Sequence, residues 1–119
     1  MGRLEEPAVW RKGMDLAKLV YSASKALPRE EKYGLISQMR RAAVSVPANI
    51  AEGYGRQSSG EYLQVLGIAR GSLLGLETMI KLCGELHYID DTSQLLDLSD
   101  ECGRLLTATR KTVERNRRK

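Results

Sequence analysis

The sequence predicts an all-α fold, an up-down antiparallel four-helix bundle, from three observations. Of its 119 residues 42% are hydrophobic and 29% are charged, with only three prolines, a composition typical of a small soluble helical domain. Apolar residues recur at helical spacing along four long segments. The connections between those segments are short, which favours antiparallel neighbours. The chain has no Phe and little clustering of Val or Thr, so strands have little support. We therefore expect one domain over residues 1–119.

The first helix is expected over about residues 8–26. Pro7 suits a helix start, and Pro28 marks the following connection, because the residue before a proline avoids the helical region. The apolar arc of this segment is wide. One face carries Trp10, Met14, Ala17 and Tyr21, and a neighbouring face carries Val9, Leu16, Val20, Ala23 and Leu27. Such an arc favours contact with more than one neighbour, either inside a monomeric bundle or between subunits.

The second helix is expected over about residues 29–54, kinked near Pro47. Proline has no N–H to donate to the carbonyl four residues earlier, and its ring crowds that carbonyl. Ser45 is then a candidate cap for a helix that restarts, with Pro47 in its first turn. Gly53 and Gly55 end the segment, as glycines often do.

The third helix is expected over about residues 59–87. Ser58 and Glu61 have the spacing of a capping box. The segment carries a seam with a period of 3.5 residues, formed by Tyr62, Leu66, Ala69, Leu73, Leu76, Ile80, Cys83 and His87. Gly67, Gly71 and Gly75 repeat on another face. Each glycine costs up to about 1 kcal/mol of helix propensity against alanine, so the repeat predicts close packing, within the bundle or between subunits.

The fourth helix is expected over about residues 92–116. Asp91 and Gln94 can cap its start. Its apolar stripe consists of Leu95, Leu98, Cys102, Leu105, Thr109 and Val113. The helix should reach the basic tail, residues 110–119, and fray there.

Two interpretations of the charges in the central stretch QMRRAAVSVPANIAEGYGR remain open. In the first, arginines and carboxylates form a buried structural ion network that fixes the helix register. Its candidate members are Arg40, Arg41, Glu52 and Glu77. In the second, the arginines face a bound anion or a partner.

The basic charge of the chain is concentrated in the tail. Residues 110–119 carry about +5, whereas the whole chain carries +4. A basic end is common in nucleic-acid-binding proteins, although lysines and arginines at a helix C-terminus also complement the helix dipole and aid solubility. The candidate nucleic-acid-binding residues are Arg110, Lys111, Arg115, Arg117, Arg118 and Lys119.

Other classes of function find little support in the sequence. The composition predicts neither a membrane span nor a signal peptide, so a cytoplasmic location is expected. Cys83 and Cys102 lie within apolar stripes without neighbouring ligands, which argues against zinc, and no cofactor is expected. The only histidine, His87, lies at the end of a core seam or in the following turn. No nucleophile and base form a recognisable pair, so the protein is expected not to be an enzyme.

The stretch QMRRAAVSVPANIAEGYGR, preceded by LPREEKYGL and followed by SSGEYLQVLGIARGSLLGLET, resembles the four-helix bundle proteins of the 23S ribosomal RNA intervening-sequence family. The resemblance covers about residues 10–88. Relatives usually read ELET where this chain has LLGLET, so Gly75 departs from the pattern. The resemblance implies a ring-like homopentamer without established enzymatic activity. A related protein, the accessory variability determinant of diversity-generating retroelements, implies nucleic acid and a reverse transcriptase as partners by analogy of fold.

These observations lead to two expectations for function. The first is a non-enzymatic oligomer, a homopentamer by resemblance, that binds RNA or DNA without sequence preference through phosphate contacts. The alternative is a protein-interaction scaffold that does not bind nucleic acid.

Overall fold

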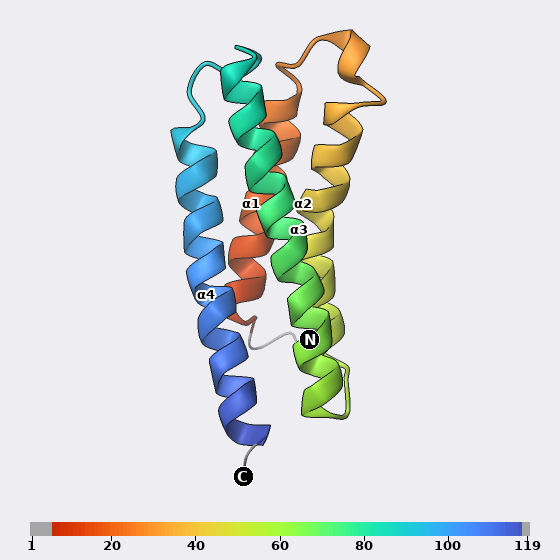
Figure 1. The fold of residues 1–119 in the computed structure, drawn as a ribbon, viewed down its shortest axis with the longest axis vertical. Coiled ribbons are helices and arrows are strands. Elements are labelled where there is room, and N and C mark those ends of the chain that lie inside the picture. Colours follow the sequence, from red (N-terminus) through yellow and green to blue (C-terminus); the bar gives the residue numbers. More distant parts are fainter. Residues whose placement is uncertain (1–5, 118–119) are drawn as a thin grey trace.

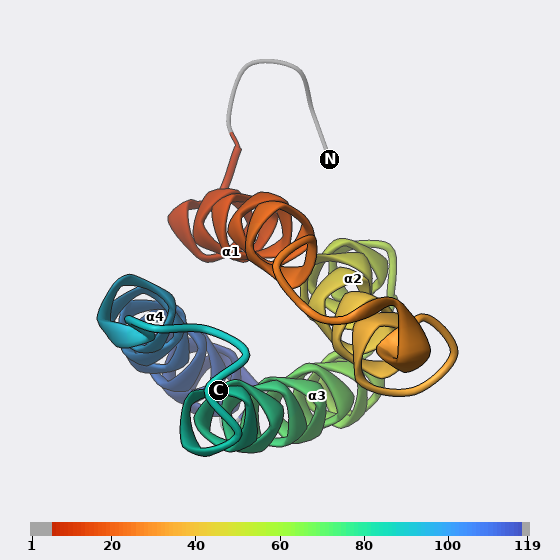
Figure 2. The same cartoon turned by 90° about the horizontal axis from the view of Figure 1, so that it is seen from above.

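The computed structural model describes residues 6–117, which fold into four α-helices and one short 3-10 turn. The helices are α1 (Ala8–Ser24), α2 (Leu35–Tyr54), α3 (Ser59–Glu85) and α4 (Ser93–Arg117). They run alternately up and down (Figure 1), and α4 packs back against α1 to close the bundle (Figure 2). The bundle measures 50 × 25 × 20 Å. The prediction of an all-α up-down four-helix bundle is confirmed.

The core follows the seam predicted for α3. Its six central members are at most 4% exposed: Leu66, Ala69, Leu73, Leu76, Ile80 and Cys83. Tyr62 is half-buried and His87 is exposed, so the seam is shorter at both ends than predicted. The buried side of α4 also differs from its predicted stripe, because Ser99 and Leu106 are buried while Leu98 and Leu105 are only partly covered.

The second helix begins at Leu35, six residues later than predicted. Pro28 precedes a 3-10 turn, Arg29–Glu31, and Gly34 then adopts a non-helical backbone with φ −106° and ψ −113°. A carboxylate oxygen of Glu31 accepts a hydrogen bond from the Leu35 N–H (3.2 Å). Glu31 thereby satisfies one of the free N–H groups at the start of α2, which is why the helix begins there.

Pro47 lies inside an unbroken helix, so the prediction that the helix restarts with Ser45 as its cap is wrong. The Ser45 hydroxyl instead pairs with the Ser72 hydroxyl of α3 (2.8 Å). Pro47 is buried against α1, where a Cβ added to Gly13 would be 3.4 Å from the Pro47 Cβ. The missing side chain of Gly13 allows α1 and α2 to approach closely at this point. The kink remains a prediction.

The ends of α3 have clear caps. The Ser58 hydroxyl accepts a hydrogen bond from the Glu61 N–H (3.1 Å), as the sequence predicts. At the other end, His87 has a left-handed backbone with φ 62°, and the N–H groups of His87 and Tyr88 donate to the carbonyls of Gly84 (3.1 Å) and Cys83 (2.9 Å). This is a Schellman motif with histidine at the position where glycine is usual. His87 is therefore a turn residue.

Within residues 6–117, α3 is the one helix long and apolar enough to cross a membrane by length and composition. This is weak evidence, because core helices of soluble proteins pass the same test. One face of α3 forms the centre of the bundle core, which accounts for much of its apolar content.

Candidate nucleic-acid interface

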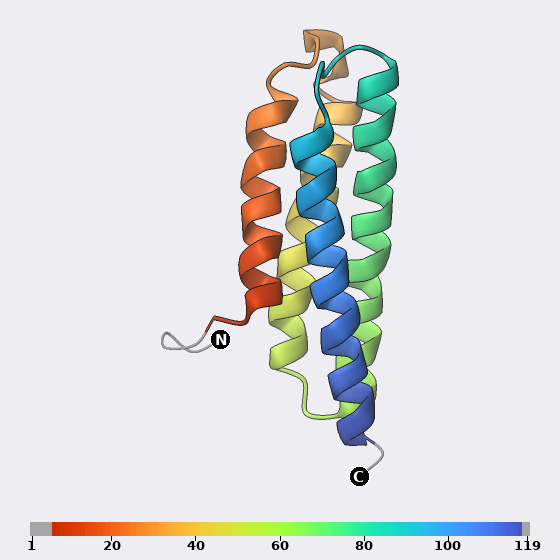
Figure 3. The same ribbon diagram turned by 90° about the vertical axis from the view of Figure 1, so that its left-hand side faces the viewer.

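The described part of the basic tail, residues 110–117, is not frayed, because α4 remains helical to Arg117. Figure 3 shows the last turns of α4 continuing past the first turn of α1, beside the connection between α2 and α3. Lys111, Arg115 and Arg117 are exposed, whereas Arg110 is half-buried. Arg118 and Lys119 lie outside the described residues. The helix therefore presents the described basic residues in fixed directions, which a frayed tail would not do.

Three cations share the outward face of α4. Arg104, Lys111 and Arg115 follow at spacings of seven and four residues, which places them on one side of a helix. All three are exposed. In the part of the chain that the structure describes, none of them forms an ion pair. This cationic stripe spans about 16 Å at 1.5 Å per residue, enough to reach several backbone phosphates.

The other two described tail arginines turn away from this stripe. Arg117 lies over the start of α3, where a Cβ added to Gly60 would be 3.7 Å from a terminal guanidinium nitrogen. The Arg110 Nε is buried and has no hydrogen-bond partner within residues 6–117. Arg117 therefore lies at the start of α3, and the Arg110 side chain is partly buried, so neither belongs to the exposed stripe.

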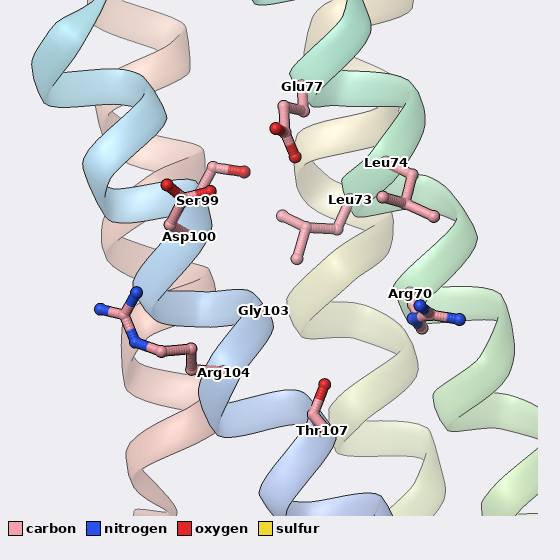
Figure 4. A pocket seen from close by; sticks show the side chains of 9 residues that line it. All are labelled: Arg70, Leu73, Leu74, Glu77, Ser99, Asp100, Gly103, Arg104 and Thr107. Carbon is pink, nitrogen blue, oxygen red and sulfur yellow. The ribbon is translucent and has the colours of Figure 1, made fainter.

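Beside the stripe, α3 and α4 enclose a shallow hollow of about 430 Å³ (Figure 4). It carries two basic and two acidic side chains, Arg70, Arg104, Glu77 and Asp100. Figure 4 shows Arg104 extending away from α3. The Ser99 hydroxyl is buried at this hollow without a hydrogen-bond partner in the described chain. Because the charges of the lining balance, the hollow itself does not attract anions. The other two members of the cationic stripe, Lys111 and Arg115, lie further along α4.

The predicted buried ion network does not form. Glu52 pairs with Arg56, which lies just after the end of α2, and Glu77 pairs with Lys81 (3.3 Å) within α3. Arg40 contacts neutral groups of α1, and Arg41 is exposed. The prediction failed because α2 and α3 bury apolar residues where they meet, and the carboxylates found partners one turn away at the surface.

Arg40 has a structural role at the end of α1. Its guanidinium donates to the Ser24 hydroxyl (2.9 Å) and the Tyr21 carbonyl (3.2 Å), and it lies 4.6 Å from the centre of the Tyr21 ring. The last turn of α1 contains no basic residue of its own. Arg40 therefore supplies, from α2, the positive charge that a helix C-terminus favours.

The described residues contain no cluster of three or more His, Cys, Asp or Glu side chains that could hold a metal ion. Both thiols are buried, and burial raises the pKa of Cys102 to about 11. A buried thiol with a raised pKa is a poor nucleophile, because the thiolate is the reactive form. Burial also raises the pKa of Cys83. Both cysteines therefore act as small core residues.

Sequence reasoning missed Arg104, because it lies outside the basic run and is preceded on its face by two acids, Asp97 and Asp100. Its spacing of seven residues from Lys111 was the available signal. Sequence reasoning also missed Lys18 of α1 and Lys25 at its C-cap, which line a hollow adjoining the one lined by Arg40 and Arg41 of α2. Only the pairing of α1 with α2 brings those four cations together.

The fold and its surface define a small helical bundle with a cationic helix end and, in its described part, no metal-binding cluster. Residues 5–108 match the family described as 23S rRNA-intervening sequence protein, and the chain belongs to this family. No curated protein matches the sequence.

A solved structure has the same fold. It is the crystal structure of a protein of unknown function from the S23 ribosomal protein family of Bacteroides thetaiotaomicron, with a TM-score of 0.80 and 24% identity, covering 87% of this chain and 99% of that one. At this identity the likeness concerns the fold alone.

Proposed function

We propose that the protein is a non-enzymatic homo-oligomer, a ring of five copies in the cytoplasm, that binds RNA or DNA through the outward face of α4. The observation that carries the nucleic-acid part is the exposed, unpaired cationic stripe of Arg104, Lys111 and Arg115. The subunit number rests on the family resemblance. The partner chemistry rests on the stripe.

The stripe favours contacts with phosphates over readout of bases. Its three side chains are cations without an interleaved aromatic residue on the same helical face, so bases have no surface on which to stack. Lysine and arginine contacts to phosphates are independent of sequence and depend steeply on salt. A ring of identical chains would repeat the stripe and increase the avidity for a long nucleic acid.

Self-association is supported by the outer face of α3. Gly67, Gly71 and Gly75 have no other atoms within 4 Å of an added Cβ, and Ile68 and Leu74 nearby are each 52% exposed. The predicted close packing around these glycines therefore does not occur inside the bundle. A neighbouring helix of a second copy would bury this face and use the space that the glycines leave.

The test combines light scattering with fluorescence anisotropy of labelled single-stranded RNA and duplex DNA at low and moderate salt. We expect an oligomer whose binding weakens steeply with salt. The variant Lys111→Glu/Arg115→Glu should weaken binding and lower the salt slope by about two per chain. This pair is sharper than deletion of residues 110–119, which would also remove the buried Val113.

The matched control is Lys18→Glu/Lys25→Glu, which changes the net charge equally on the opposite side of the bundle. Binding that falls to the same extent in both variants would reflect net charge and overturn the assignment to α4. An oligomer that binds neither nucleic acid at low salt would also overturn it.

The second candidate function is a protein-interaction scaffold without nucleic-acid binding. The exposed apolar face of α3 favours it, because such a face suits a protein surface rather than a phosphate backbone. A reverse transcriptase is a candidate partner by family analogy alone. Retention of one specific protein in a pull-down, with no binding of nucleic acid at low salt, would favour this alternative.

A further inference from the structure

A groove runs along the outer side of α1 and α2, away from the α4 stripe. It consists of two adjoining hollows of about 490 and 500 Å³ that share Tyr21 and Val44 in their linings. These two side chains are 42% and 45% exposed, so the groove is open to solvent along its centre. From Met14 to Lys25 it extends about 16 Å along α1, the length of three helical turns.

The floor of the groove is apolar. Met14 and Ala17 of α1 meet Val44 and Pro47 of α2 there, with Tyr21 at the centre. These residues of α1 belong to the face of the wide apolar arc that carries Met14, Ala17 and Tyr21. The neighbouring face lies in the core, where Leu16 and Val20 are fully buried. The face with Tyr21 therefore packs against α2 and remains partly uncovered.

The rim of the groove is cationic on both sides. Lys18 comes from α1 and Lys25 caps its C-terminal end, Arg40 and Arg41 come from α2, and no acidic residue belongs to either lining. None of the four forms an ion pair within residues 6–117. The chain outside its last ten residues has a net charge of about −1, so four cations without an ion pair around one groove are a local concentration of charge.

Several polar side chains that line the groove have partners within the chain. Arg40 holds the Tyr21 ring through the 4.6 Å stacking contact and is itself fixed by the buried Ser24 hydroxyl. The Ser45 hydroxyl is paired with Ser72 and also accepts from the Asn49 side-chain amide (2.9 Å). Because these polar groups are satisfied within the chain, a ligand would be recognised by apolar burial and by charge.

We propose that this groove binds an amphipathic helix of a partner protein, about three turns long, with apolar residues along its centre and Asp or Glu along both edges. Apolar anchors at spacings of three, four and seven residues would lie on the floor, and the acids would face the four cations. The proposal is independent of the proposed function, since it uses a different surface and a different ligand chemistry.

Two other occupants fit the groove less well. A nucleic acid gains nothing from an apolar floor, and Arg40 already covers one face of the Tyr21 ring. The outer face of α3 in a second copy is apolar, but Arg70 and Lys81 are exposed beside it and would meet the cations of the rim. An acidic helix avoids both mismatches.

The experiment is a selection of random helical peptides displayed on phage against the full-length protein. We expect the enriched peptides to combine apolar residues at i, i+3, i+4 and i+7 with Asp or Glu on both edges. One such peptide, labelled and titrated by fluorescence anisotropy, should bind at least tenfold more weakly to Lys18→Glu/Arg41→Glu. It should bind unchanged to Lys111→Glu/Arg115→Glu.

The location is then mapped by NMR with the same peptide. Shifts at Tyr21 and Val44 are expected, and shifts confined to other surfaces would overturn the proposal. Enrichment of basic or non-helical peptides, or of none, would also overturn it. So would a change of oligomeric state in Lys18→Glu/Arg41→Glu by light scattering, since the groove would then be a contact between copies. Both substituted side chains are exposed, so the variant is expected to fold, and circular dichroism checks this.

Discussion

The two faces of α3 are both apolar, but only one of them is covered. The inner face carries Leu66, Leu73 and Leu76 at no more than 4% exposure, whereas on the outer side Ile68 and Leu74 are 52% exposed and Leu82 is 42% exposed. The inner face repeats large side chains with a period of 3.5 residues, and the outer side is interrupted by three glycines. Apolar content alone therefore does not identify the core. The unbroken repeat of apolar residues every three to four positions does.

The same comparison shows that packing inside the bundle does not account for the three glycines on the outer face. Inside the bundle, Gly13 and Gly53 leave room for Pro47 and for the Tyr62 ring, so a neighbour uses the space. On the outer face Gly67, Gly71 and Gly75 cost helix propensity and no described atom uses the space. This contrast supports the proposal that a second surface covers the outer face of α3.

The largest expected effect is the loss of a core contact on the inner face. Leu76 is fully buried, so Leu76→Ala should lower the free energy of unfolding by about 3 kcal/mol through lost apolar burial and a residual cavity. Leu74→Ala, at an exposed position of the same helix, should change it by about 0.5 kcal/mol or less. Urea denaturation of both variants measures the contrast. Equal losses would mean that the outer face contributes as much stability as the inner one.

The next effect concerns the three outer glycines. Since an alanine Cβ would meet open space at each position, the triple variant Gly67→Ala/Gly71→Ala/Gly75→Ala should raise the stability of the single chain by about 2 to 3 kcal/mol. If a neighbouring copy packs there, the same variant should weaken its oligomer. Urea denaturation at low concentration and light scattering measure the two effects. A variant that is no more stable would contradict the open environment of these positions.

An inner glycine should respond in the opposite direction. A Cβ added to Gly53 would lie 2.6 Å from the Tyr62 ring, so Gly53→Ala should lower the free energy of unfolding by about 2 kcal/mol through overpacking. The near-ultraviolet circular dichroism of the nearby tyrosines should also change. Tyr62→Leu/Gly53→Ala tests whether removing the aromatic ring relieves the clash, and unchanged stability of the single variant would refute the close contact.

The smallest expected effect lies at the C-terminal end of α3. His87 has a left-handed backbone, with φ 62°, which costs an L-residue about 1 kcal/mol relative to glycine. His87→Gly should therefore raise the melting temperature and the free energy of unfolding by about that amount. His87→Val should lower both, because a branched side chain is least tolerant of this backbone. Thermal denaturation of the two variants together separates the free-energy cost of the left-handed backbone from any stabilisation by contacts of the imidazole ring.

Much of the fold could be predicted because its signals are local. The seam of α3, the Ser58 cap and the order of the helices follow from spacing and from turn residues. The start of α2 was wrong because the Glu31 carboxylate caps Leu35 after a glycine, a detail that periodicity does not reveal. The prediction of a buried ion network was wrong because Glu52 and Glu77 each pair with a basic side chain four residues away.

The candidate site was only partly predictable. The sequence singled out the basic tail, but it could not separate Lys111 and Arg115, which face outward, from Arg110, which is half-buried, and Arg117, which lies over the start of α3. Nor could it add Arg104, whose role depends on which side of α4 faces solvent. The direction in which a side chain points can be predicted only when the side of the helix that packs against the bundle is known.

The sequence by itself determined the helical class, the inner seam of α3 and the concentration of positive charge near the end of α4, because each depends on residues close together in the chain. The tertiary structure alone decided which apolar face stays uncovered, which arginine of the Arg40–Arg41 pair turns to α1, and that four cations surround one groove between α1 and α2. These features depend on distances between helices. The chain encodes them only through the packing of the whole bundle.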